Sequence, residues 1–412
     1  MNLLIQKFGG TSVQTKENRT HVIKQIKQGL KDASKLVVVV SAIGRSPDPY
    51  ATDTLLKMVD YKEKSPDNLR ELDMLMSCGE TIASVILSNE LQQNGIKATA
   101  LTGAQAGLIT NDSFTEAKIK KVKPDRIKHE LSSHDVVVVA GFQGRTEEGD
   151  ITTIGRGGSD TTAVAFGASL KASYVDIFTD VSGIMTADPR VVDDAQTIDV
   201  VTYSETSNLA IQGAKVIHPR AVEIAMQAEI PIRIRSTYSD EIGTLITASR
   251  GKEVGIDIAD RLVTGIAHMT DISQLNVSID EADMLAQAEV FQTMADADIS
   301  VDFINMSPTN IVYTVPTDVL TEAVTLLEDK GYSVAVVENC SKVSAVGAGM
   351  TGIPGVAAKI TTALTQHDVK VLQSADSHTT IWVLVADSQL KTAMNALHDA
   401  FELHKPHKIT NQ

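Results

Sequence analysis

Short apolar runs alternate with longer amphipathic segments along residues 1–250. Six runs rich in valine, isoleucine or leucine predict buried β-strands, at Leu3–Gln6, Leu36–Ser41, Ala98–Leu101, Val136–Gly141, Tyr174–Thr179 and Ile230–Ile234. Five segments have the apolar spacing of helices, at Arg19–Lys31, Leu72–Gln93, Asp125–Ser132, Asp160–Leu170 and Arg220–Ala228. Apolar strands separated by helices predict a mainly parallel sheet that is covered on both faces. We therefore expect an α/β/α sandwich in this part of the chain.

The pattern changes after a charged, glycine-containing stretch at Ser249–Arg261, which we interpret as a linker. Beyond it, Asp298–Val315 aligns without a gap with Asp368–Val385, at an offset of 70 residues. Each copy reads strand–helix–strand–strand–helix, and the first is followed by a further strand, which is typical of a ferredoxin-like βαββαβ unit. We place these two domains at 262–338 and 341–405. Two copies are too few for a solenoid, so we expect them to pack sheet to sheet or to pair with another subunit.

Composition and charge narrow the function classes. The chain has 412 residues, 43% of them apolar and 22% charged, as in a soluble protein with more than one domain. Its formal charge of −15 argues against nucleic acid and anionic membranes as partners. The two cysteines, Cys78 and Cys340, lack metal-ligand spacing, and the N-terminus has no signal-peptide pattern, so we expect a cytoplasmic protein. The longest apolar runs have the length of strands, which excludes a membrane span.

Glycine and hydroxyl residues follow the predicted strands. Gly9-Gly10 comes after the first strand, Ser41 ends the second, and Gly141–Gly144 follows the fourth. Ligands bind beyond the carboxyl ends of parallel strands, so these residues mark the expected site. The run Lys7-Phe8-Gly9-Gly10-Thr11-Ser12 combines a cation, two glycines that let backbone N–H groups approach closely, and two hydroxyls, which suits a polyphosphate. Its lysine precedes the glycines, unlike that of a Walker A loop, which indicates a different kind of kinase.

A second glycine-rich run precedes the predicted helix at Asp160–Leu170. It reads Gly155-Arg156-Gly157-Gly158-Ser159-Asp160, and either Ser159 or Asp160 suits a helix N-cap. The free N–H groups of a first helical turn favour an anion, and Arg156 can bind a carboxylate through two parallel hydrogen bonds. The alternative is a glycine-rich turn before an ordinary capped helix. The presence of both Arg156 and Asp160 favours an anion site.

Other residues leave a functional and a structural interpretation open. Gly79 lies inside a predicted helix at a cost of about 1 kcal/mol relative to alanine, which a closely bound ligand would explain. Glu80 would then receive an ammonium group, but a packing glycine beside a solvated glutamate is the favoured interpretation. The loop Phe178–Arg190 either frames a nucleotide or is a plain connection. Lys215, like His404 and His407 in the polar tail, is typical of a solvated side chain.

Together these motifs resemble the aspartokinases, which have the amino-acid-kinase fold. Lys7–Ser12, Gly155–Asp160 and Thr179–Arg190 match in order, and the two C-terminal copies resemble the paired ACT domains of these enzymes, through Gly352–Ala357 and Ser374–Val385. The chain is most similar to the monofunctional bacterial type, and within it to the diaminopimelate-sensitive form of Gram-positive bacilli. The resemblance implies ATP-dependent phosphorylation of the L-aspartate side chain to 4-phospho-L-aspartate, the first step toward lysine, diaminopimelate, threonine and methionine.

The resemblance also implies a role for each site residue. Lys7 and Asp160 match catalytic residues. Substrate-binding positions are Ser41, Glu80, Arg156, Gly157, Gly158 and Ser159, and ATP-binding positions are Lys7, Phe8, Gly9, Gly10, Thr179, Asp180, Asp188, Arg190 and Lys215. Glu80 then holds the ammonium group of aspartate, and Lys215 belongs to the nucleotide pocket, in place of the solvated roles above. The expected effector residues are Ile353, Gly355, Val356, Ser374 and Asp376. ATP and Mg²⁺ are the implied cofactors, with no protein ligand assigned to the metal.

The chemistry agrees with this assignment. A carboxylate with a pKa near 4 is already ionised at pH 7, so the nucleophile needs no general base. Repulsion between the carboxylate and the polyphosphate opposes the reaction instead. Catalysis is then alignment and charge neutralisation by Lys7, Arg156, backbone N–H groups and Mg²⁺. Asp160 is expected to orient Lys7 or to help with Mg²⁺ rather than to accept a proton.

The chain departs from the family in two places. Many aspartokinases have a substrate-contacting threonine near the position of Pro47, and here Thr52 or Thr54 would have to serve. Met284-Leu285 stands where the second ACT copy has Pro354-Gly355, so we expect the two copies to bind effector unequally. Effector sites between ACT domains of two subunits imply at least a homodimer. Overall resemblance alone points to meso-diaminopimelate as the effector.

Two rival functions stay open at this point. Another amino-acid kinase, for glutamate or acetylglutamate, would not be expected to carry the ACT pair. A catalytically dead amino-acid sensor would not need Lys7, Arg156 and Asp160 intact.

Overall fold

The N-terminal sheet has eight strands in the order β10-β12-β11-β9-β1-β2-β6-β3. The computed structural model describes residues 2–60, 65–214, 216–248, 262–281, 285–350 and 352–405. Within them, all neighbouring strands of this sheet are parallel except β11 and β12. The bounds are β1 (Leu3–Phe8), β2 (Lys35–Val40), β3 (Ala98–Leu101), β6 (Val136–Ala140), β9 (Val175–Thr179), β10 (Val200–Thr202), β11 (Ile232–Ser236) and β12 (Thr244–Thr247). The predicted mainly parallel sheet is confirmed, and each of the six predicted strands is present.

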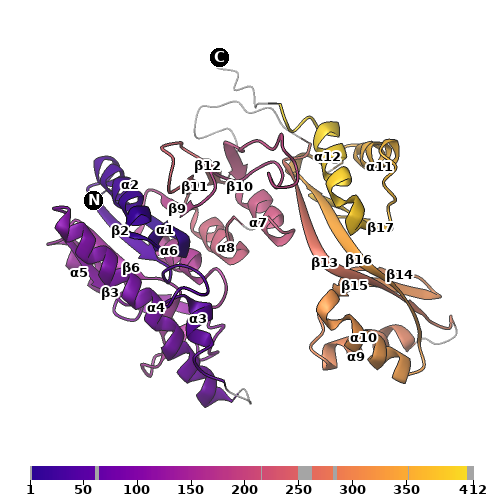
Figure 1. Ribbon diagram of the computed structural model, residues 1–412, viewed down its shortest axis with the longest axis horizontal. Helices are drawn as coiled ribbons and strands as arrows, with labels where there is room; N and C mark the ends of the chain where they lie inside the picture. Colours follow the sequence, from indigo (N-terminus) through magenta and orange to yellow (C-terminus); the bar gives the residue numbers. More distant parts are fainter. Residues whose placement is uncertain are drawn as a thin grey trace.

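Helices cover both faces of this sheet (Figure 1). Alternate residues of β1 and β2 point to opposite cores: Leu4 and Val38 pack under α2 (Lys16–Asp32) and α4 (Pro66–Gln93). Ile5 and Val37 pack on the other face, under α5 (Asp125–Leu131), α6 (Gly158–Leu170), α7 (Tyr203–Ile211) and α8 (Pro219–Ala228). This is the expected α/β/α sandwich. Short helices α1 (Gly10–Val13) and α3 (Thr52–Leu56) follow the first two strands, and a small sheet contains β4 (Leu108–Thr110), β5 (Ile119–Val122), β7 (Gln143–Arg145) and β8 (Ile151–Thr153).

The C-terminal unit is one antiparallel sheet of six strands, in the order β14-β15-β13-β16-β18-β17. Its strands are β13 (Gly265–Ser278), β14 (Asp302–Met306), β15 (Asn310–Pro316), β16 (Ser333–Val346), β17 (Gln373–Asp376) and β18 (Thr380–Ala386). Its α-helices are α9 (Ala286–Asp296), α10 (Leu320–Asp329), α11 (Val356–Gln366) and α12 (Leu390–Ala400). The two α-helices of the second copy each begin 70 residues after those of the first, which is the predicted offset, and Asp298 and Asp368 share a left-handed φ of 56°. Two βαββαβ copies are thus confirmed.

The two copies exchange strands instead of packing face to face. The second half of β13 pairs with the first half of β16, as Val277 with Val334, and completes the first copy. The first half of β13 pairs with the second half of β16, as Gly265 with Val346, and supplies the fourth strand of the second copy. The expectation of sheet-to-sheet packing within the chain is therefore wrong, and the proposed boundary between 338 and 341 falls inside β16. The predicted linker Ser249–Arg261 lies outside the described residues.

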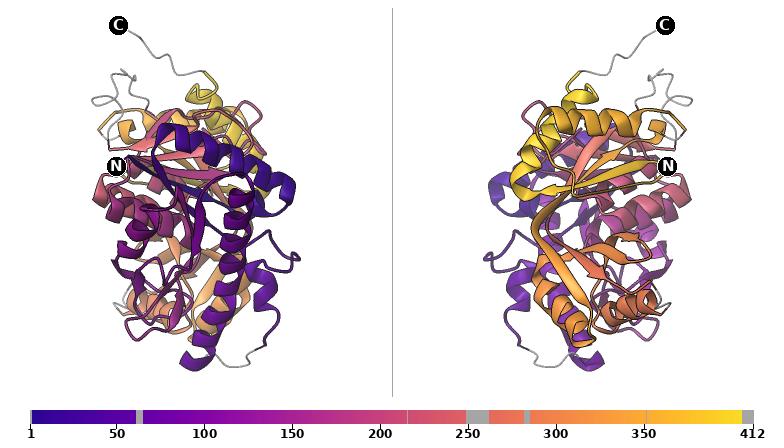
Figure 2. Two further views of the ribbon diagram at one scale, coloured as in Figure 1. Left: turned by 90° about the vertical axis from the view of Figure 1, so that its left-hand side faces the viewer. Right: turned by 90° about the vertical axis from the view of Figure 1, so that its right-hand side faces the viewer.

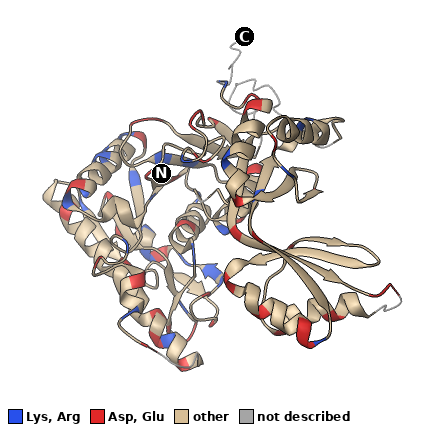
Figure 3. Ribbon diagram, turned by 45° about the vertical axis from the view of Figure 1, so that its right-hand side comes forward, with Lys and Arg blue, Asp and Glu red and all other residues tan. Residues whose placement is uncertain are grey.

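The two units lie side by side in Figure 1 and one behind the other in the end views of Figure 2, and a shared core joins them. Ala187 and Val192, from the loop after β9, pack in one cluster with Val343, Val385 and Leu397 of the C-terminal unit. Acidic and basic residues are interspersed over both units (Figure 3). In the described part of the chain, no helix combines the length and apolarity needed to cross a bilayer.

Candidate active site

The first predicted motif lies at the carboxyl edge of the parallel sheet. Lys7 is the penultimate residue of β1, between β2 and β9, and Asp160 is in the first turn of α6. The Lys7 Nζ atom is 2.7 Å from the Asp160 Oδ1 atom, and the two side chains are 13% and 12% exposed. Residues far apart in the sequence thus form one ion pair, which solvent and ligands can still reach.

Backbone contacts require glycine at one of the two glycine positions of this motif, Gly10. A Cβ atom on Gly10 would lie 2.5 Å from the Ala42 carbonyl oxygen and 2.8 Å from that of Gly44, so only glycine fits. The Gly44 N–H donates to the Gly10 carbonyl at 3.0 Å. The Phe8 ring is fully buried and stacks on Phe178, with 4.7 Å between ring centroids, so Phe8 can face a nucleotide only through its backbone.

The second motif forms the turn that opens α6. Its N-cap is Gly157, with a left-handed φ of 69°, and no side chain caps the helix. The prediction of Ser159 or Asp160 as N-cap is therefore wrong, because both lie inside the first turn. The Gly158 N–H donates to the Gly155 carbonyl at 3.0 Å, and no side chain caps the other N–H groups of the first turn, which stay available to an anion. Arg156 is exposed and forms no ion pair with any described residue, so its guanidinium is also available.

Glu80 lies in the middle of α4 and is only 2% exposed. Its Oε1 atom accepts the Ala42 N–H at 3.1 Å, and within the described ranges its Oε2 atom has no hydrogen-bond partner. Burial raises the pKa of Glu80 to about 8. A buried carboxyl with one unpartnered oxygen is not the solvated glutamate that the residues alone favoured, and it is suited to receive a cation.

Gly79 is explained by packing. A Cβ atom there would lie 2.7 Å from the Tyr50 carbonyl oxygen and 2.8 Å from the Ala42 Cβ atom, so the loop after β2 occupies the space that a ligand was expected to fill. Ser41 begins this loop, and its N–H donates to the Phe8 carbonyl at 3.2 Å. Of the two candidate threonines, Thr54 has a buried hydroxyl oxygen without a partner among the described residues.

The proposed nucleotide loop follows β9. The Thr179 hydroxyl donates to Asp180 at 3.0 Å. Asp188 and Arg190 pair with each other at 2.7 Å, where the hydrogen bonds from Arg190 lower the pKa of Asp188, and the Arg190 side chain is 86% exposed. Their loop also contacts the C-terminal unit, since Asn395 donates to the Val191 carbonyl at 3.2 Å. Lys215 lies outside the described residues.

One residue beside the site was missed by sequence reasoning. His218 lies against the Gly157 turn, where a Cβ atom on Gly157 would come within 2.2 Å of the His218 Cβ atom. A lone histidine without a ligand spacing carries no motif that would have identified it.

The predicted effector residues gather in the C-terminal unit. Ile353, Gly355, Val356 and Asp376 line a surface cavity of about 580 Å³ at the start of α11. Ser374 is on the adjoining strand β17 and pairs with Val383.

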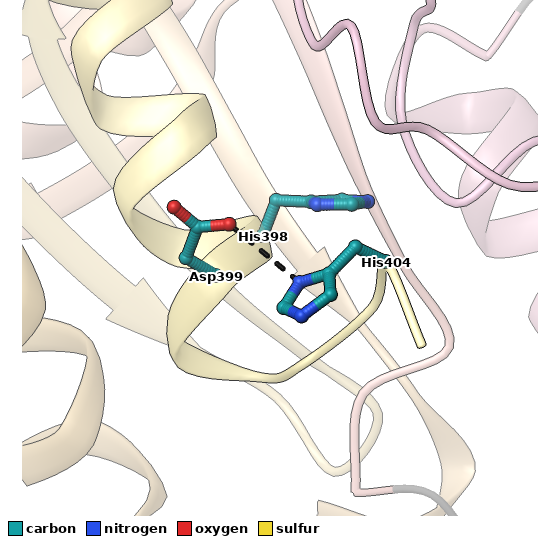
Figure 4. Close-up of side chains that lie close together, drawn as sticks. All are labelled: His398, Asp399 and His404. Carbon is teal, nitrogen blue, oxygen red and sulfur yellow. Dashed lines mark ion pairs between the residues drawn. The ribbon is translucent and has the colours of Figure 1, made fainter. Parts of the chain in front are cut away.

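A histidine cluster lies at the end of α12, in the same copy as α11 (Figure 4). Donor atoms of His398, Asp399 and His404 lie within 4.8 Å of one another. The His398 Nε2 atom is 2.9 Å from the Thr186 hydroxyl oxygen, so this buried ring joins α12 to the loop after β9. His404 is 3.6 Å from Asp399, and His407 lies outside the described residues.

Comparisons with known proteins agree with this geometry. Residues 2–236 match the amino acid kinase family, and residues 335–399 match an ACT domain. The chain is 56% identical over 405 residues to aspartokinase 1 of Bacillus subtilis, covering 98% of this chain and 100% of the relative. The chain belongs to the aspartokinase family. It is 37% identical to the aspartokinase of Geobacillus stearothermophilus, with 98% of both chains covered.

Solved aspartokinases share the whole fold. Escherichia coli aspartokinase III in complex with aspartate and ADP matches with a TM-score of 0.75 and 25% identity, covering 97% of this chain and 99% of that one. The Clostridium acetobutylicum aspartate kinase matches in fold with a TM-score of 0.78 at 23% identity, covering 97% and 100%. Family membership over the full length makes this chain an aspartate kinase with an ACT regulatory unit, rather than a glutamate or acetylglutamate kinase.

Proposed function

We propose that this aspartokinase transfers the γ-phosphoryl group of ATP to the L-aspartate side-chain carboxylate at the edge formed by Lys7, Asp160, Arg156 and Glu80. The observation that carries the proposal is the Lys7–Asp160 ion pair of 2.7 Å at the carboxyl end of β1. The buried Glu80 lies at the same edge of the sheet. The Ala42 N–H donates to Glu80, and the Ala42 carbonyl packs against Gly10.

Each residue then has a role that follows from its charge and position. Arg156 and the N–H groups of the first turn of α6 hold a carboxylate of aspartate, and the Glu80 Oε2 atom accepts its ammonium group. Lys7, oriented by Asp160, neutralises the phosphoryl group as it moves to a carboxylate that is already ionised. Mg²⁺ binds mainly to substrate phosphates and water, so we expect it to enter with ATP, and we assign no protein ligand to it.

Trapping of the product tests this function. Enzyme, ATP, Mg²⁺ and aspartate with hydroxylamine should give aspartohydroxamate, and glutamate in place of aspartate should not. Lys7→Met should abolish the product, whereas Lys16→Met, at the exposed start of α2, should not change it. Wild-type enzyme that forms no hydroxamate would favour the rival function of an amino-acid sensor.

We further propose that an amino acid binds as effector in the cavity at the start of α11. Gly355 is the N-cap of this helix, with a left-handed φ of 93° and no side-chain cap, so its first-turn N–H groups can hold a carboxylate. Asp376 on the cavity wall can hold an ammonium group. The first copy differs, because the N-cap of α9 is Leu285, which is right-handed, with a φ of −95°, and 75% exposed. These differences support one type of effector site in each chain.

The effector proposed for this site is meso-diaminopimelate. Assays with lysine, threonine and meso-diaminopimelate added separately should show inhibition by the last, and Asp376→Asn should weaken it. Strong inhibition by lysine alone would overturn the choice.

We also propose at least a homodimer formed through the C-terminal unit. Exposed apolar side chains lie on the edge strand β14, with Ile304 and Met306 at 45% and 55% exposure, and on the central strand β16, with Val337 at 41%. Solvent-exposed apolar groups at a sheet edge favour association. Light scattering should give a dimer or larger, and Met306→Lys should shift it toward the monomer; a monomeric wild type would refute this.

A further inference from the structure

His218 occupies an unusual position at the start of α8. It is the N-cap of this helix, and its Nδ1 atom accepts the Arg220 N–H at 3.3 Å. A ring nitrogen that accepts carries no proton, so the neutral ring holds its proton on Nε2. Burial lowers the pKa of His218 and so favours the neutral ring, while the nearby Asp160 charge acts to raise this pKa.

The His218 side chain is pressed against the anion-binding turn. A Cβ atom on Gly157 would lie 2.2, 2.3 and 2.6 Å from the His218 Cβ, Cγ and Cδ2 atoms. The imidazole therefore lies directly on the Gly157 backbone, between Arg156 and the first turn of α6. Gly157 has a left-handed φ of 69°, which glycine adopts without strain, and the contact with His218 leaves no room for a Cβ atom there.

The start of α8 is itself held firmly. The Arg220 guanidinium donates to the Ile154 and Ala117 carbonyl oxygens, each at 3.2 Å. Ile154 immediately precedes the turn Gly155–Gly158, so Arg220 fixes α8 to the strand side of the turn and His218 supports its helix side. Two contacts from one helix end thus enclose the turn.

We propose that His218 is a positioning residue for aspartate: its ring supports Gly157 and so holds Arg156 and the N–H groups of the first turn of α6 in place for the substrate carboxylate. This rests on the aspartate site proposed above. His218 acts through the turn, without proton transfer.

Two substitutions separate this role from simple helix capping. His218→Asn keeps a good N-cap but removes the ring. It should raise KM for aspartate about tenfold, because even a small displacement of Arg156 and the first-turn N–H groups weakens their hold on the substrate carboxylate. The value of kcat should stay within about twofold, and KM for ATP and Tm should not change. His218→Phe keeps a ring against Gly157 but loses the cap, and it should lower Tm with KM for aspartate near the wild-type value.

Control measurements distinguish failure of the inference about His218 from failure of the proposed function. His129→Asn, an exposed histidine on α5, should leave both constants unchanged. An unchanged KM for aspartate in His218→Asn, or equal rises in KM for aspartate and ATP, would overturn the inference while wild-type hydroxamate formation stands. Absence of wild-type hydroxamate would instead overturn the proposed function.

Discussion

The buried Glu80 makes aspartate binding a proton-releasing reaction. Its pKa of about 8 means that about 90% of Glu80 is neutral at pH 7. The ammonium group of aspartate needs the ionised form, so binding must expel this proton. The apparent Kd for aspartate should then fall about ninefold from pH 6 to pH 7 and about fivefold from pH 7 to pH 8, and level off above about pH 9.

Calorimetry gives a direct measurement. Titrations of aspartate in two buffers of different ionisation enthalpy at pH 7 should report release of about 0.9 proton for each aspartate bound. Glu80→Gln should bind aspartate weakly and without this pH dependence, whereas Glu71→Gln, exposed on the same helix, should behave as wild type. A Kd for aspartate that stays flat between pH 6 and pH 8 in the wild type would refute the reasoning.

Three other predictions follow from the same geometry. Unfolded glutamate has a pKa of 4.5, whereas folded Glu80 has a pKa of about 8, so between these pH values the folded protein holds a proton that the unfolded chain lacks. Glu80 therefore lowers the stability of the folded protein as the pH rises. Glu80→Gln should raise the free energy of unfolding by about 3 kcal/mol at pH 7 and by under about 1 kcal/mol at pH 5, measured by urea unfolding. Asp160→Asn should lower kcat by about 100-fold, because Lys7 loses its orienting charge, and nearly full kcat would exclude an essential charged role. Gly157→Ala should lower Tm and raise KM for aspartate, since the methyl group meets both the His218 ring and an unfavourable φ; unchanged values of both in thermal melts and kinetics would contradict the close contact.

Continuous apolar strands could be predicted, and short mixed ones could not. The run Leu36–Ser41 was predicted as a strand because its four consecutive valines indicate burial on both faces, and it corresponds to β2 at Lys35–Val40. Strands such as β10 and β7 have only three residues each, too few to show a period, and neither was predicted. The repeat predicted which segments are equivalent, but equivalence does not say which strands pair, so the exchange between β13 and β16 was invisible.

The candidate active site was also only partly predictable from the sequence. The family resemblance matches Lys7 and Asp160 to catalytic residues, with Asp160 orienting Lys7 or helping with Mg²⁺, and the fold brings the two side chains to within 2.7 Å. The N-cap was assigned wrongly because side-chain preference says nothing about the left-handed φ at Gly157. Glu80 looked solvated, since burial in the middle of a helix depends on the loop that covers it. His218 gave no signal because its contact is with a residue 61 positions away.

The exchange of strands between the two regulatory copies limits how this chain can evolve. A copy formed by duplication can normally be lost again, because each domain carries its own complete sheet. Here, deletion of the second copy would remove the partner of Gly265–Met269 and leave the first half of a 14-residue strand, β13, exposed as an open edge. Deletion of the first copy would take away the fourth strand of the second. We therefore expect the two copies to be kept or lost together, because neither has a complete sheet without the other.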